Sequence, residues 1–166
     1  MENIQMYFNA ERAESLVFMA IGIIAFVAGI YFFFFLKKPF YTGMAWPLII
    51  VAVIQIFVGG AVFIRSPKDI ARVEIMFSTN HPALTTEEIP RMETVMKNFV
   101  VYRGVEIALA AVGVILILAQ IFGSIGQGFG TGLLIQSLLM LVADYFAMKR
   151  GQLYLDWLQE LAKNIR

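Results

Sequence analysis

The chain has 166 residues, of which 60% are hydrophobic and only 15% are charged, with a formal net charge of +1 and no cysteine. This composition excludes an ordinary soluble domain, because a fold of this size could not bury so much apolar surface. It also excludes a nucleic-acid-binding protein, which would need a basic stripe, and any disulfide or thiol chemistry. The composition therefore predicts an integral membrane protein.

Four long apolar runs organise the chain, at about residues 15–36, 44–64, 104–122 and 130–148. Each is close to the roughly 20 residues that a helix needs to cross the hydrocarbon core. The first run is preceded by three acids and followed by no cleavage site, so we expect a retained helix and not a signal peptide. We predict an all-α integral membrane protein in which residues 1–166 form a single four-transmembrane-helix bundle.

The basic residues predict the orientation of this bundle. Of 13 Lys and Arg residues, only Lys37 and Lys38 fall on one side of the spans, and the others fall on the opposite side. Because cytoplasmic flanks carry the excess of Lys and Arg, we expect both termini and residues 65–103 in the cytoplasm. The hairpins 37–43 and 123–129 would then be external, and the second, which is uncharged and glycine-rich, is interpreted as a flexible turn. The short loops favour a bacterial inner membrane.

The segment between the second and third spans has a helical pattern of its own. Ser66 and Pro67 form a start signal for a short amphipathic helix, which the sequence at 79–82 interrupts. A second helix is predicted to begin near Pro90 and to continue without a break to about residue 122. The tail 151–166 is amphipathic too, and we expect a separate helix that lies on the membrane surface or packs against the other cytoplasmic helices.

The two halves of the chain show a weak internal repeat. Arg12 aligns with Arg103, and Gly22 aligns with Gly113, so each half has a basic residue ten positions before a glycine. Two spans per unit would make the repeats parallel, related by an axis along the membrane normal. The alternative is a chance match between two apolar helices with a basic flank.

Charged residues intrude on the spans only near their cytoplasmic ends. They suggest an ion-paired layer formed by Arg12, Glu14, Arg103, Glu106 and Asp144. Two interpretations stay open: a proton-linked, ion-linked or partner-binding site, or charges that only fix the depth and packing of the helices. Asp144 is the residue to test first, because a carboxylate in a span is energetically unfavourable.

Deeper in the spans, Gln55 and Gln136 are the candidates for an interhelical hydrogen bond. His81 is the only histidine, and it lies in a polar loop without a nucleophile or a metal-binding motif near it. We therefore expect no catalytic residue, no metal site and no cofactor.

Three functions are compatible with these features. The preferred hypothesis is a non-catalytic membrane interaction protein, such as an assembly or regulatory subunit or an immunity-type factor. Its partners would be the lipid bilayer and another membrane or cytoplasmic protein, or further copies of the chain. The alternatives are a small oligomeric transporter or channel, and an enzyme that acts on lipid or quinone at the membrane interface.

Overall fold

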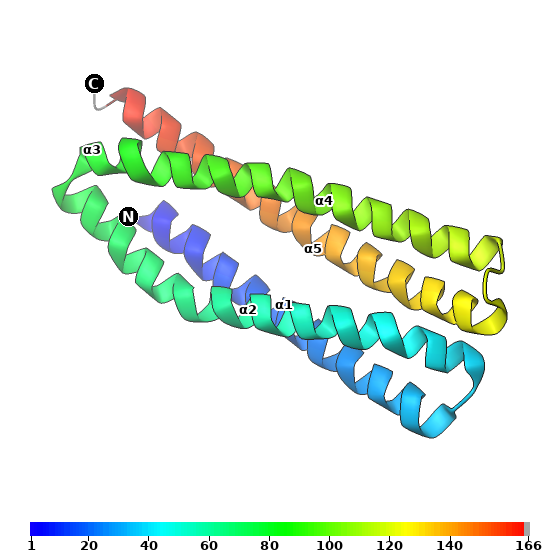
Figure 1. The fold of residues 1–166 in the computed structure, drawn as a ribbon. Helices are drawn as coiled ribbons and strands as arrows, with labels where there is room; N and C mark the ends of the chain where they lie inside the picture. Colours follow the sequence, from blue (N-terminus) through cyan, green and yellow to red (C-terminus); the bar gives the residue numbers. More distant parts are fainter. Residues whose placement is uncertain (165–166) are drawn as a thin grey trace.

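The computed structural model describes residues 1–164 and is helical almost throughout (Figure 1). The long helices are α1 (Glu2–Tyr31), α2 (Pro39–Thr79), α4 (Ile89–Leu118) and α5 (Gly123–Asn164). The shorter elements are α3 (His81–Ala83) and the π-helical turns η1 (Phe32–Leu36) and η2 (Leu84–Glu88). Four helical runs are long and apolar enough to cross a membrane. The predicted all-α class and the four long apolar helices are therefore confirmed.

Helix α2 is one helix of 41 residues and is not divided at Ser66, so the predicted start of a separate helix there is wrong. Ser66 is fully buried, and its hydroxyl donates a hydrogen bond to the Val62 carbonyl at 2.8 Å, within the helix. The same hydroxyl lies 3.4 Å from Glu11 on α1. The local start signal does not end the helix here, because contacts with α1 keep α2 continuous through Pro67. The predicted interruption after Thr79 is confirmed.

The glycine-rich segment 123–129 is also helical, which corrects its interpretation as a flexible turn. A Cβ atom on Gly128 would overlap the carbonyl oxygen of Phe40, and one on Gly43 would overlap that of Ile125. The glycines thus allow α2 and α5 to approach closely, which small residues commonly do between apolar helices. The turn lies instead at residues 119–122.

Helix α4 begins at Ile89 with Pro90 in its first turn, as predicted, and ends at Leu118, four residues before the predicted end. The chain then reverses through Gln120 and Phe122, both of which have positive φ angles. Helix α5 runs on without a break into the tail, so the tail is not a separate helix. Ile165 and Arg166, the last residues of the predicted tail helix, lie outside the described residues.

The helices form two antiparallel hairpins, α1 with α2 and α4 with α5, which are joined side by side by contacts between α2 and α5. The Cα atoms of α4 do not come within 8 Å of those of α1 or α2, and α4 meets α1 through side chains in the charged end, where Arg91 lies over the Phe8 ring. The start of α1, the end of α5 and α3 lie at the same end of the molecule (Figure 1). We call residues 1–14, 65–103 and 149–164 the charged end, and residues 15–64 and 104–148 the apolar half.

The hydrophobic core lies in the charged end. All four long helices contribute to it, through residues that include Ile4, Tyr7, Phe8, Val73, Met76, Met92, Tyr154 and Leu158. Tyr7 stacks on Tyr154 with ring centroids 4.2 Å apart, and this contact joins α1 to α5. Burial raises the pKa of Tyr7 to about 12, so its hydroxyl stays neutral in the core. The charged end therefore fastens the two hairpins together.

The apolar half is built differently. Its buried hydrophobic residues, among the described residues, are only Ala45, Leu48, Ala52 and Leu133. Large apolar side chains such as Phe57, Ile24 and Leu118 are instead 69% to 76% exposed. Exposure of such a large apolar surface to water is energetically unfavourable, whereas its contact with lipid tails is not.

Candidate functional site

The five charged residues of the predicted layer separate into distinct environments. Glu14 on α1 accepts two hydrogen bonds from the guanidinium group of Arg150 on α5. This ion pair connects the two hairpins where the charged end meets the apolar half. Arg150 was counted in the sequence only as a cytoplasmic base, because nothing in the local sequence indicates a partner 136 residues away.

The two predicted bases make no ion pair with the predicted acids. The Arg12 guanidinium carbon lies 4.3 Å from the centre of the Phe63 ring, a cation–π contact between α1 and α2. Arg103 is exposed, and it takes part in none of the ion pairs between described residues. The alignment of Arg12 with Arg103 therefore does not extend to their surroundings, although Gly22 and Gly113 both pack inside their own hairpins.

The two remaining acids lie beside each other. The carboxyl groups of Glu106 on α4 and Asp144 on α5 are within hydrogen-bonding range. Glu106 is only 2% exposed, and its Oε2 atom is buried with no other partner. An acid therefore pairs with an acid at this point, and the two residues connect α4 to α5.

The glycine contacts fix the relative depths of the helices in the apolar half. A Cβ atom on Gly132 of α5 would lie 2.7 Å from Pro47 of α2, and these two helices run in the same direction. A Cβ atom on Gly113 of α4 would lie 2.7 Å from the carbonyl oxygen of Gly130 of α5, and these two run in opposite directions.

The two glycine contacts show which residues of neighbouring helices lie at the same depth, and each further residue adds about 1.5 Å along a helix. On this basis, Gln55, Glu106 and Gln136 lie within about 6 Å of one another along the bundle axis. Both glutamine side chains are 0% exposed, and none of their four amide atoms has a hydrogen-bond partner. The predicted hydrogen bond from these glutamines is therefore not formed to any group in the described residues. Asp144 lies about 12 Å beyond Gln136 along α5, toward the charged end, and belongs with these residues through its contact with Glu106. We call Gln55, Glu106, Gln136 and Asp144 the polar layer.

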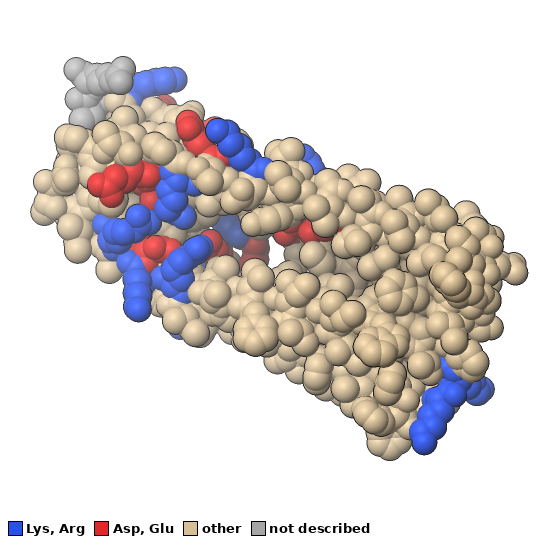
Figure 2. Space-filling model, viewed as in Figure 1, with Lys and Arg blue, Asp and Glu red and all other residues tan. Residues whose placement is uncertain are grey.

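A hollow opens near this level. Figure 2 shows a recess between α4 and α2, about midway along the molecule, with acidic side chains inside it. This agrees with the separation of the two backbones, since no Cα atom of α4 comes within 8 Å of one in α2. In the apolar half, the only charged residues besides the acids of the polar layer are Lys37 and Lys38 at the far tip. The polar layer and the hollow together form the candidate functional site.

A second buried polar cluster lies in the charged end and was not predicted. Glu88 is 0% exposed and accepts hydrogen bonds from Arg91 at 2.6 and 2.8 Å and from Arg72 at 3.3 Å. Tyr154 donates a further hydrogen bond of 3.4 Å to Glu88. The spacing of Glu88 and Arg91, three residues apart in a helix, was the available signal. The cluster was not predicted because the charged residues of a cytoplasmic helix were expected to be exposed to solvent.

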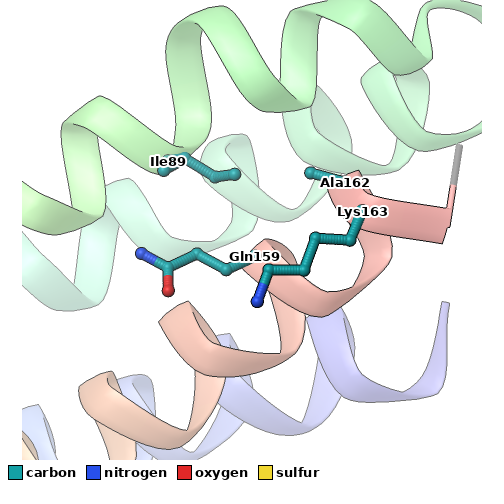
Figure 3. A pocket seen from close by; sticks show the side chains of 4 residues that line it. All are labelled: Ile89, Gln159, Ala162 and Lys163. Atoms are coloured by element: carbon teal, nitrogen blue, oxygen red, sulfur yellow. The ribbon is translucent and has the colours of Figure 1, made fainter. Parts of the chain in front are cut away.

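Two cavities lie away from the polar layer. One of about 220 Å³ lies between the start of α4 and the end of α5, and its lining is Ile89, Gln159, Ala162 and Lys163 (Figure 3). Its single charged group cannot act as part of an acid–base pair. Within the described residues, no three acidic or histidine side chains gather in a group that could hold a metal ion.

We compared the chain with protein-family models, with curated proteins and with solved structures, and none of these comparisons found a match.

Proposed function

We propose that the protein is an integral membrane protein of four transmembrane helices, with the charged end in the cytoplasm of a bacterial cell and the apolar half in the inner membrane. The exposed apolar side chains of that half support this placement, because they need a lipid environment. The distribution of Lys and Arg supports the orientation.

The orientation can be tested by cysteine labelling, since the chain has no cysteine. We expect a His81→Cys variant to react with a membrane-impermeant maleimide only after the cells are opened. A Lys38→Cys variant should react in intact cells. The two positions lie at opposite ends of the molecule, so each variant is the control for the other. Labelling of residue 81 in intact cells would contradict the proposed orientation.

We further propose that the protein is a non-catalytic interaction protein that binds a transmembrane helix of a partner. The hollow beside the polar layer carries this proposal. Lipid tails would be poor occupants of a recess that contains carboxyl groups, because they offer no hydrogen bonds. A helix with polar or basic side chains could instead bond to Asp144, which is the partly exposed member of the layer. The packed charged end holds the two hairpins on either side of this recess.

The partner can be sought by purification of the tagged chain, at native levels and in mild detergent, from its own host. We expect a second protein in stoichiometric amount, and about five-fold less of it with an Asp144→Asn variant, since interhelical polar contacts are worth roughly 1 kcal/mol. The matched control is Tyr145→Phe, because Tyr145 is the neighbouring residue and is 57% exposed. Recovery of the free protein alone would count against a stable partner.

The paired acids also favour a second candidate, a small oligomeric transporter. Membrane-embedded carboxyl groups are common in proton and ion pathways. Flux of an ion or solute in proteoliposomes that disappears in the Asp144→Asn variant would favour this function over the first.

A further inference from the structure

We propose that Glu106 and Asp144 form a proton-binding site that holds a single proton between their two carboxyl groups. This site goes beyond the interaction function, because it gives the protein a ligand of its own. The first support is the direct contact of the two carboxyl groups. Two ionised carboxylates cannot lie side by side in an apolar environment without strong repulsion, whereas one shared proton turns the contact into a hydrogen bond.

The second support is that no base neutralises the pair. The nearby bases are engaged or point elsewhere: Arg150 is paired with Glu14, and Arg12 lies over Phe63. Arg103, on the same helix as Glu106, is exposed. Helix α2 offers the uncharged Gln55 at this depth. A proton is therefore the cation that this contact can hold without moving the helices apart.

The third support comes from the rest of the polar layer. Gln55 and Gln136 are wholly buried, lie at nearly the same depth as Glu106, and have no partner for any amide atom. An unpartnered buried polar group costs about 1–3 kcal/mol, so a layer of this kind is not explained by packing alone.

The proton site has a mechanical consequence. Glu106 and Asp144 connect α4 to α5 beside the hollow, and the Cα atoms of α4 do not come within 8 Å of those of the other hairpin. Loss of the proton would leave two negative charges in contact, and their repulsion would push α4 away from α5. We therefore expect the width of the hollow to depend on the protonation of this pair.

The site can be tested with dicyclohexylcarbodiimide, an apolar reagent that modifies protonated carboxyl groups in membranes. In proteoliposomes, we expect one adduct per chain, located by peptide mass mapping at Glu106 or Asp144, with less labelling as the pH is raised. The double variant Glu106→Gln, Asp144→Asn should lose at least nine-tenths of the labelling. The control Glu93→Gln removes an exposed acid from the same helix and should change nothing.

Mapping of the wild-type protein decides the question even where the double variant does not fold. The single variant Asp144→Asn keeps a neutral hydrogen-bonding group in place and provides a second, conservative test. Absence of an adduct on both residues at every pH would overturn the proposal. Protection by Na⁺ at constant pH would also overturn it, because the ligand would then be a metal ion.

Discussion

Replacement of Gly113 by leucine should prevent α4 and α5 from packing, whereas the same replacement at Gly104 should leave the fold intact. A Cβ atom at Gly113 would lie 2.7 Å from the carbonyl oxygen of Gly130 and 3.1 Å from the amide nitrogen of Leu134. These are backbone atoms, so the clash can be relieved only by moving one helix. We expect a loss of about 3 kcal/mol or more, at the upper end of the usual cost of overpacking.

Gly104 provides the matched control on the same helix. No atom lies within 4 Å of a Cβ atom built there, so leucine would only extend into the surroundings of the helix. It should even favour the helix by up to about 1 kcal/mol relative to glycine. Thermal unfolding followed by circular dichroism, with size-exclusion chromatography in detergent, measures both variants. Equal unfolding midpoints for the two would show that the close contact at Gly113 does not exist.

The second large effect is expected at the buried cluster of the charged end. An Arg91→Met variant keeps most of the length of the side chain but removes the charge. It leaves the fully buried carboxylate of Glu88 with the longer contacts from Arg72 and Tyr154. Breaking a buried ion pair on one side typically costs 3–5 kcal/mol, and we expect about 3 here because Arg72 remains. Chemical or thermal unfolding in detergent gives the value.

Two further variants separate the charge from the packing. The double variant Glu88→Gln, Arg91→Met should recover much of the lost stability, because no uncompensated charge stays buried. Arg65→Met removes a base that is 53% exposed and is paired with Asp69 and Glu11, and it should change stability by no more than about 1 kcal/mol. A loss as large as that of Arg91→Met would show that burial does not set the strength of these pairs.

The sequence was sufficient to predict features that depend on local or averaged properties. Four helix-length apolar runs follow from hydropathy alone, and the ends of helices at Thr79 and near Pro90 follow from residues that resist helical geometry. These features need no knowledge of what lies across the fold. For the same reason, the all-α class could be predicted without any structural information.

The features that were missed depend on contacts between distant segments. Ser66 and Pro67 resemble a helix start, but packing against α1 keeps α2 continuous. The glycines of 123–129 resemble a loop, but they allow α5 to approach α2. The acids of the candidate layer were expected to find bases, and the partner of Asp144 is another acid. The functional roles of these residues stay predictions.

Because α2 and α5 are each continuous, a tilt of either helix in the apolar half also moves its end in the charged end. Helix α2 has 41 residues and α5 has 42, so each is one unbroken helix, roughly 60 Å measured along its axis, that passes from the apolar half into the charged end. About 22 Å of α2 lies beyond the last apolar turn, and a tilt of roughly 10° in the apolar half would move its tip by about 4 Å. A small change in the spacing of the helices in the apolar half would thus displace the helix ends in the charged end by about the length of a side chain.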